Sequence, residues 1–499
     1  MREIGGGGSP AANAVACRKV LSALTAVLIL VPGCAPVGPD YQKPELPVPA
    51  AWSSGGLPGE TVTGAPAGEL SRWWERLGDD TLTGLIEQAL SGSTDVRTAQ
   101  ARLREARARR GVAAAGLFPT VTASGSASRS WKSDSDYGPG DTSSLYSAGF
   151  DAAWEPDVFG GTRRGIEAAQ ADLESAEADL HAAQVSLAAE VALNYVDARS
   201  YQTMLAIAQK NLASQSETYQ LTDWRTQAGL ATSLDVEQAR TNLEQTRAKI
   251  PTLTAALAEA EHRLAVLLGQ APGAVRQTMA AAAPVPAVPD AVAAGIPADA
   301  LGNRPDVRVA ERRLGAETAR VGQAVAARYP GFNLNASIAL DALTLGGLDA
   351  GGIFTRSLLG RVVAPVFDAG RLRQQVEVQD AVQEQALIGY EATVLTALEE
   401  VENALVSLSE NRRRQSSLRA AVEAARNAAL LARHRYTAGL IDFQTVLDTE
   451  RTQLTVEEAL ANAQAGGATA LIQLYKALGG GWQLDAPGSG AAESEGGRT

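Results

Sequence analysis

The stretch HRYTAGLIDFQTVLDTER, residues 434–451, places an Ala-Gly-Leu triplet inside a run that otherwise favours helix. The same triplet occurs in WRTQAGLATSLDVEQAR, residues 224–240, and again follows an arginine. Glycine accepts the left-handed backbone conformation that commonly ends helices. The pattern therefore predicts two turns, each joining a pair of antiparallel helices. The first turn consists of Ala228, Gly229 and Leu230, and the second of Ala438, Gly439 and Leu440.

The two turns belong to a duplication with a nearly constant offset of about 210 residues, which is typical of repeated architectures. Asp95-Val96-Arg97, for example, recurs as Asp306-Val307-Arg308. We predict a first repeat at residues 71–272 and a second at 298–482. A Pro- and Ala-rich linker at 273–297 joins the repeats, and a flexible tail follows at 483–499.

Within each repeat the hydrophobic pattern changes in the same order. A helical segment is followed by period-two alternation, as in GFNLNASIAL at residues 331–340, which predicts strands. The predicted β-hairpins cover 119–155 and 331–367, the last strand lying near 356–367. Long helical hairpins follow at 161–270 and 370–479, with coiled-coil spacing of apolar residues. Helical runs of about 65 residues span roughly 100 Å, although Pro251 and Gly466-Gly467 weaken the return helices.

The strands have the length of tilted membrane strands, and backbone in lipid must be fully paired. One chain offers four strands, whereas membrane barrels begin at about eight, so several copies must contribute. The fold class is therefore mixed, mainly α, with transmembrane strands forming a shared β-barrel and long helices packing into an α-barrel. The alternative is a soluble fold with a small sheet against the helices.

The N-terminus resembles a bacterial lipoprotein signal. Arg18-Lys19 precede a short apolar run, and Gly33-Cys34 matches a lipobox, so residues 1–33 are the expected signal peptide. Cys34 would become the lipidated first residue of an extended segment, 34–70, and Ala35 after it favours the outer membrane. The alternative is an ordinary signal cleaved near Ala35. Apart from Cys34, the mature chain would contain no cysteine and therefore no internal disulfide.

Several segments resemble the TolC-like outer-membrane factors. They are WWERLGDDTLTGLIEQALSGSTDVRTAQARL at 73–103, NRPDVRVAERRL at 303–314, APVFDAGR at 364–371 and LYKALGGGW at 474–482. The start of the expected mature chain, CAPVGPDYQKPELPVP at 34–49, is similar to the mature start of the lipoprotein branch of this family, which serves resistance–nodulation–division efflux pumps. The resemblance covers residues 34–482, although Ser93 replaces the usual asparagine.

This resemblance implies a homotrimer with a twelve-stranded outer-membrane barrel and a twelve-helix periplasmic tube. It also implies a periplasmic adaptor protein and an inner-membrane pump as partners. The expected function is a passive, gated duct that exports drugs or other small toxic solutes, without catalysis, cofactor or metal. A net charge of −12 also disfavours nucleic-acid binding.

The resemblance also implies roles for individual residues. Asp448 and Arg451 match positions of the closed periplasmic aperture, and Gln444 stands where some relatives have leucine. Without the resemblance, Asp448 and Arg451 fit a solvated helix face with an i, i+3 pair. The turn residues at 228–230 and 438–440 are expected to dock the adaptor.

Aromatic residues of the first predicted β-hairpin are candidates for an interfacial belt, with generic packing as the alternative. They are Trp131, Tyr137, Tyr146 and Trp154.

Two other functions remain open from the sequence. One is the outer-membrane exit of a type I protein secretion system, which shares the fold. The other, from a different class, is a periplasmic coiled-coil scaffold lipoprotein without a pore.

Overall fold

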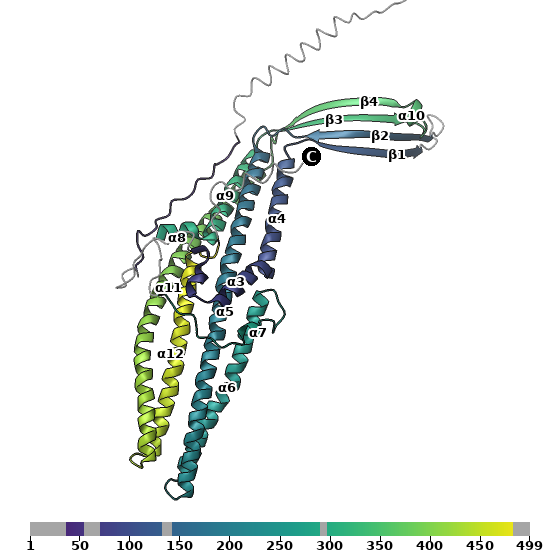
Figure 1. Ribbon diagram of the computed structural model, residues 1–499. Helices are drawn as coiled ribbons and strands as arrows, with labels where there is room; N and C mark the ends of the chain where they lie inside the picture. Colours follow the sequence, from purple (N-terminus) through teal and green to yellow (C-terminus); the bar gives the residue numbers. More distant parts are fainter. Residues whose placement is uncertain (1–35, 54–69, 132–141, 290–296, 483–499) are drawn as a thin grey trace, which may run out of the picture. The chain divides into compact units, whose positions relative to one another are not determined.

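The computed structural model describes residues 36–53, 70–131, 142–289 and 297–482 (Figure 1). The predicted signal peptide, Cys34, Tyr137 and the tail at 483–499 lie outside these residues. Within the described ranges, no helix is both long enough and apolar enough to cross a membrane.

The two sequence halves contain the same main elements in the same order, as the duplication predicts. In the first half these elements are η1 (Trp73–Leu77), α3 (Asp80–Gly92), α4 (Thr94–Ala115), β1 (Thr120–Trp131), β2 (Thr142–Trp154), α5 (Gly161–Gln227) and α6 (Ser233–Leu267). In the second half they are α8 (Pro297–Asn303), α9 (Pro305–Ala326), β3 (Gly331–Ala342), α10 (Gly347–Ala350), β4 (Ile353–Val363), α11 (Arg371–Thr437) and α12 (Phe443–Ala477). A short helix, α7 (Arg276–Met279), lies between the halves.

The described chain forms two compact units, and each takes segments from both halves. The sheet unit contains the described residues of 36–42, 107–172 and 314–386. The hairpin unit contains those of 43–106, 173–313 and 387–482. The sequence repeat is therefore not the unit of packing, because strands and helices of one half pair with those of the other.

The sheet unit holds a four-stranded antiparallel sheet in the order β1-β2-β3-β4. The central pairing joins the two halves, since Phe150 of β2 lies opposite Ile338 of β3. The fourth strand begins at Ile353 and ends at Val363, earlier than the predicted 356–367. Pro365 explains the earlier end, because proline has no N–H for the ladder.

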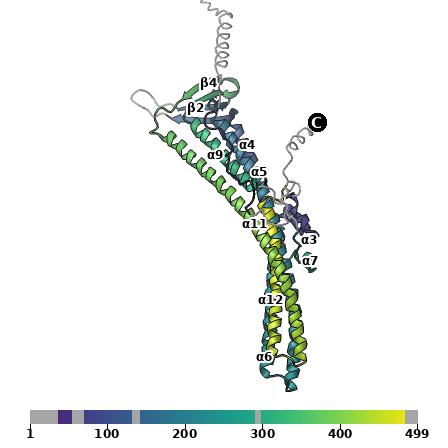
Figure 2. The same ribbon diagram turned by 90° about the vertical axis from the view of Figure 1, so that its left-hand side faces the viewer.

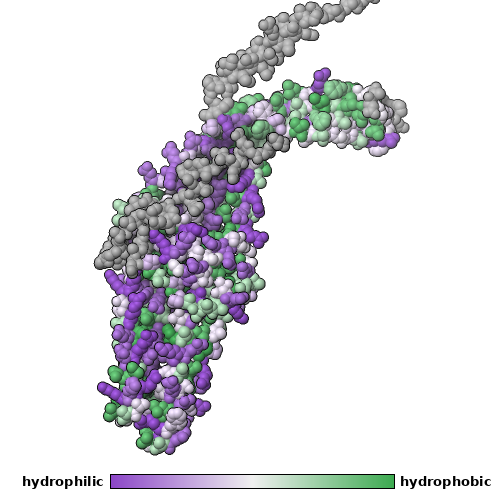
Figure 3. Space-filling view, in the orientation of Figure 1, coloured by the Kyte–Doolittle hydropathy of each residue, from purple (hydrophilic) through white to green (hydrophobic). Residues whose placement is uncertain are grey.

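The register gives the sheet two chemically different faces. Tyr146, Phe150, Leu334, Ile338 and Leu358 lie on one face, which is predominantly apolar. The opposite face carries paired polar groups, namely Ser124 with Asp151, Ser130 with Ser143, Ser337 with Ser357 and Thr355 with Asp341. Figure 3 shows hydrophobic residues gathered on the sheet, where Phe150 and Leu358 are 61% and 73% exposed. Such a sheet suits lipid on one side and water on the other.

The hairpin unit is built from two long helical hairpins, α5 with α6 and α11 with α12 (Figure 2). The return helices continue through the residues that weaken helices, since Pro251 lies inside α6 and Gly466-Gly467 inside α12. Gly467 has a packing role. A Cβ there would lie 2.5 Å from Nε2 of Gln415, which approaches from α11.

The core of the hairpin unit includes elements of both halves. Trp73 of η1 stacks on Tyr475 of α12 with ring centroids 5.3 Å apart, and both side chains are fully buried. The buried Arg304 fastens the end of α12 to the start of α9. Its Nη1 donates to the Ala477 carbonyl at 2.8 Å, and its Nη2 donates to Asp306 and Glu400 at 2.6 and 2.7 Å.

Candidate functional site

The Ala-Gly-Leu triplets form the turns that end both long helices (Figure 2). In the first turn Gly229 has φ of 76°, its N–H donates to the Thr226 carbonyl, and the Leu230 N–H donates to the Arg225 carbonyl. This pair of hydrogen bonds is the Schellman arrangement, which requires a left-handed residue. The repeated triplet is therefore explained by one local geometry.

The second turn repeats that geometry. Gly439 has φ of 72°, its N–H donates to the Tyr436 carbonyl, and the Leu440 N–H donates to the Arg435 carbonyl. Each return helix then starts at an N-cap, Thr232 for α6 and Asp442 for α12. The six tip residues at 228–230 and 438–440 are all exposed, with Leu230 at 68% and Leu440 at 72%.

The two tips are also tied to each other. Nη1 of Arg225, on α5, donates to the carbonyl of Tyr436 at 2.9 Å, close to the end of α11. Its guanidinium lies 4.6 Å from the Tyr436 ring centroid. A cation near a helix C-terminus interacts favourably with the helix dipole. In the sequence Arg225 lies three residues before the Ala-Gly-Leu triplet, but nothing in the sequence indicates this contact between the halves.

The three predicted aperture residues lie on the exposed side of α12, within its first three turns. Nε2 of Gln444 donates to Oδ1 of Asp448 at 2.9 Å. Nε of Arg451 donates instead to Oδ1 of Asn242 on α6, at 3.2 Å. The structure therefore orients Asp448 through Gln444 and directs Arg451 toward the other hairpin, which the sequence pattern did not reveal.

The opposite side of α12 carries two buried carboxylates that the sequence analysis missed. Oε1 of Glu450 accepts from Thr218 at 2.7 Å, and Oε2 of Glu457 accepts from Asn211 at 3.1 Å. Arg426 of α11 also donates to Glu457, at 2.6 Å. Both glutamates occupy positions of the apolar stripe, seven residues apart, and that spacing was the available signal. They link α12 to α5 through a polar contact.

Their surroundings shift the pKa values of the two carboxyl groups in opposite directions. Burial raises the pKa of Glu450, although the hydrogen bond from Thr218 and the charge of Arg433 partly offset it. For Glu457, burial opposes ionisation, but hydrogen bonds from Arg426, Asn211 and Gln453 prevail and lower the pKa. Oε2 of Glu450 has no hydrogen-bond partner among the described residues.

The predicted interfacial aromatics lie at different levels of the sheet. Trp131 is at the end of β1, opposite Thr142, and is 72% exposed. Trp154 is at the other end, and its Nε1 donates to the Leu117 carbonyl at 2.9 Å. Tyr146 lies near the Trp131 end on the same apolar face, opposite Ala127.

The start of the described chain is fastened to the sheet unit. Val37 N–H donates to the Phe159 carbonyl at 3.1 Å. The buried Arg164 of α5 donates to the carbonyls of Val37 and Gly38 and to Asp40, at 3.1, 3.2 and 2.7 Å. Pro36–Asp40, which we call the arm, is therefore held in place two residues after Cys34.

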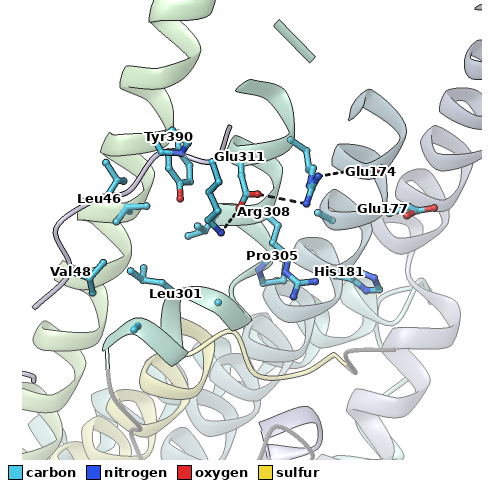
Figure 4. A pocket seen from close by; sticks show the side chains of 18 of the residues that line it. Leu46, Val48, Glu174, Glu177, His181, Leu301, Pro305, Arg308, Glu311 and Tyr390 are labelled. Atoms are coloured by element: carbon cyan, nitrogen blue, oxygen red, sulfur yellow. Dashed lines mark hydrogen bonds and ion pairs between the residues drawn. The ribbon is translucent and has the colours of Figure 1, made fainter. Parts of the chain in front are cut away.

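A cavity of about 1100 Å³ lies in the hairpin unit, between residues 43–48 and helices α5, α9 and α11 (Figure 4). Its buried Glu311 accepts from Lys43 at 2.8 Å. Arg308 lies 5.1 Å from the ring centroid of Trp482, and burial lowers the pKa of Arg308. The Lys43–Glu311 pair fastens this part of the N-terminal segment. Among the described residues, no group of three or more His, Cys, Asp or Glu is placed to hold a metal ion.

Comparisons with known proteins agree with this architecture. The model of the family described as outer membrane efflux protein matches residues 85–270 and 296–480. The nodulation protein T of Rhizobium leguminosarum bv. trifolii is 33% identical, over 91% of this chain and 96% of that protein. The toluene efflux pump outer membrane protein TtgC of Pseudomonas putida is 33% identical, over 93% of this chain and 96% of its own.

Solved structures give the same result. The outer-membrane channel OprN superposes with a TM-score of 0.84 at 38% identity, covering 90% of this chain and 100% of that one. The MtrE outer membrane channel of Neisseria gonorrhoeae, in its open state, has a TM-score of 0.78 at 28% identity, over 90% of this chain and 99% of its own.

The fold is that of trimeric outer-membrane channels. The chain belongs to the outer membrane efflux protein family. The predicted TolC-like fold, outer-membrane location and efflux function are thereby confirmed. Channels of this family form homotrimers and work with adaptor and inner-membrane pump partners.

Proposed function

We propose that three copies of this chain form the passive, gated duct of a tripartite efflux pump that exports small toxic organic solutes. The observation that carries the proposal is the two-faced sheet, whose outer strands β1 and β4 each have one edge that pairs with no other strand among the described residues. An unpaired strand edge is not tolerated in lipid, and a sheet of four strands is too small to close on itself. Three such sheets give twelve strands, 3 × 4, which is enough for a barrel.

The order of strands supports closure between copies. Thr120, at the start of β1, lies at the same end of the sheet as Val363, at the end of β4, because every neighbouring pair is antiparallel. When β1 of one copy meets β4 of the next, the new pair is also antiparallel. The ring of strands therefore closes without any change in direction.

The periplasmic aperture is proposed at Asp448, Arg451 and Gln444. Three copies of Asp448 give a ring of carboxylates, which narrows a pore and disfavours anions. The contact from Arg451 to Asn242 joins the α12 and α6 helices beside this ring. The position equivalent to Asp448 in the first half is Gln238, so the acidic ring comes from the second half alone.

Single-channel recording in planar bilayers tests the aperture. Asp448→Ala is expected to raise the basal conductance, because it removes the ring charge and shortens the side chain. Gln238→Ala is the matched control and is expected to leave conductance unchanged. Unchanged currents in Asp448→Ala would return Asp448 to the role of an ordinary solvated residue, while the duct itself would stand.

The tips are proposed to dock a periplasmic adaptor. Leu230 and Leu440 expose apolar side chains at the far ends of both hairpins, and a trimer would present six such turns. Exposed apolar groups at a rigid turn suit a protein partner. Tagged protein recovered from cross-linked envelopes should carry an adaptor and a resistance–nodulation–division pump. Recovery of a secretion ATPase instead would replace the efflux pump by a type I secretion system.

The class of solute is proposed from relatives. TtgC is named a toluene efflux pump protein, and another relative from Pseudomonas putida is named a pyoverdine export protein. These names differ widely in solute chemistry, which fits a duct that passes what its pump delivers. Deletion of the chain should therefore sensitise cells to the same compounds as deletion of its partner pump.

A further inference from the structure

The two outer strands of the sheet connect to α4, which is basic, and to α11, which is acidic between residues 374 and 410. α4 leads into β1, and α11 leaves β4, so each unpaired sheet edge has its own helix. α4 contains six arginines and only two acidic residues, Asp95 and Glu105. α11 contains no lysine or arginine from residue 374 to residue 410, where it carries eight acidic side chains.

One face of α11 is covered by its own chain. Gln379 donates to Glu317 at 2.7 Å and Gln383 donates to Thr318 at 3.1 Å, both on α9. A different face carries Glu377, Glu384 and Glu391, which repeat every seven residues and are all exposed. Ile388 and Leu395 share this face and are 56% and 67% exposed. We call this face the acidic stripe. Apolar and charged residues at heptad spacing are typical of a helix that packs against another helix.

The matching face of α4 is uncovered as well. Arg97 and Arg104 are seven residues apart and exposed, and between and beyond them lie the small residues Ala101, Ala108 and Gly111. We call this face the arginine stripe. No side-chain hydrogen bond or ion pair among the described residues involves Arg97, Arg104, Glu384 or Glu391. The charges of both stripes are therefore available to a partner.

The charges also lie at matching depths along their helices. From the end of α4 next to β1, Arg104 lies ~17 Å and Arg97 ~27 Å away, at 1.5 Å per residue. From the start of α11 next to β4, Glu384 lies ~20 Å and Glu391 ~30 Å away. The two helices run in opposite directions relative to the sheet. The same spacing on both therefore allows two arginine–glutamate pairs at once.

We propose that the acidic stripe of one copy docks on the arginine stripe of the next copy, and that these charges select the correct neighbour during assembly. The inference rests on the proposed trimer and adds the helical part of its interface. Pairing of β4 with β1 between copies brings the two helices together. Opposite charge then favours this contact over α4 with α4 or α11 with α11, where like charges repel.

Cysteine cross-linking tests the contact. In a Cys34-lipidated background, Arg104→Cys with Glu384→Cys should give covalently linked copies up to the trimer after mild oxidation. Arg104→Cys with Gln383→Cys is the matched control, because Gln383 faces α9 of its own chain; it should give no linked copies. Absence of links in an intact Arg104→Cys/Glu384→Cys trimer, or links in the control alone, would overturn the proposal.

Charge reversal tests the selection. Arg97→Glu with Arg104→Glu should reduce the yield of trimer at least about tenfold in low salt, because like charges then oppose each other. Adding Glu384→Arg and Glu391→Arg to the same chain should restore it, which shows that the first variant had not simply failed to fold. An unchanged trimer in the first variant, or no rescue in the second, would contradict the proposal. Wild-type trimers that conduct no current would instead count against the duct, so the two failures are distinguishable.

Discussion

Single side chains in α12 have two opposite environments within one helix turn. Asp448 is exposed and held by Gln444, whereas Glu450 is 3% exposed and meets Thr218 of α5. A buried carboxylate needs hydrogen-bonding partners to offset the loss of water. Glu457 has three donors, while one oxygen of Glu450 has none among the described residues. Of the two buried carboxylates between the hairpins, Glu457 is therefore better satisfied in its hydrogen bonding than Glu450.

This difference predicts opposite effects for the same substitution at the two glutamates. Glu457 has a lowered pKa when folded, so its stabilisation is present above the unfolded pKa and is lost as pH falls through the folded pKa. Glu457→Gln should lower the stability at pH 7.5 by about 1–3 kcal/mol. The difference from wild type should shrink below about pH 4, as wild-type Glu457 also becomes protonated.

Glu450→Gln is the comparison on the same helix. The folded pKa of Glu450 is raised, so its ionised form weakens folding above the unfolded pKa, and that effect disappears in acid. Its melting temperature at pH 7.5 should equal or exceed that of wild type. Thermal unfolding followed by circular dichroism from about pH 2 to about pH 8 measures both variants. Equal losses in both would show that the carboxylates are equivalent.

At the scale of elements, the helix ends are set by short, local signals. The two 67-residue helices α5 and α11 both stop where glycine takes a positive φ and the return helix begins at a polar N-cap. The interior Gly389 does not stop α11, because it keeps the helical conformation. A glycine alone therefore does not predict the end of a helix. The N-cap of the return helix, which follows Gly229 and Gly439 but not Gly389, completes the signal.

Alanine substitutions separate these two kinds of glycine. Gly229→Ala and Gly439→Ala should each destabilise the protein by about 1–2 kcal/mol, because a Cβ is strained in the left-handed conformation. No neighbouring atom lies within 4 Å of the added Cβ, so no steric clash contributes. Gly389→Ala, also unobstructed, should stabilise α11 by about 0.5–1 kcal/mol. Melting temperatures check all three, and a stabilised Gly439→Ala would refute the turn geometry.

At the scale of the whole molecule, the proposed lipid on Cys34 gains support from the fixed position of the arm. Arg164 and the Phe159 carbonyl hold Val37 and Gly38 on the sheet unit, close to the β2–α5 connection. An acyl chain on Cys34 would therefore be tethered within a few residues of the predicted membrane strands. Lipid and strands are expected to enter the same membrane.

Metabolic labelling with an alkyne palmitate analogue tests this anchor. Cys34→Ser should abolish labelling, because the thiol is the proposed attachment point. Arg164→Met is the control, since it loosens the arm without changing the lipobox, and it should keep the label. Label that persists in Cys34→Ser would remove the lipoprotein assignment and favour an ordinary signal cleavage near Ala35.

Much of this architecture is readable from local patterns. The 331–340 alternation marks β3, and the absence of glycine and proline from residue 166 to residue 227 marks α5. The fourth strand is predicted too late in the chain because its apolar residues run together, as in Leu358-Leu359, and hide the periodicity. The buried Glu450 and Glu457 are missed because charge suggests a solvated position, although both lie on the apolar stripe of α12 and contact α5.

The sequence by itself determined the duplication, the helix-ending turns, the two-faced strands and the family, because each depends on residues close together or on a repeated motif. Only the tertiary structure decided which groups meet across the halves, such as Arg225 with Tyr436 and Arg451 with Asn242. These contacts depend on how helices more than 200 residues apart in sequence pack. No local pattern specifies that arrangement. Within the described residues, the same packing leaves one edge of β1 and one of β4 without a partner strand, and these are the edges that the proposed trimer would pair.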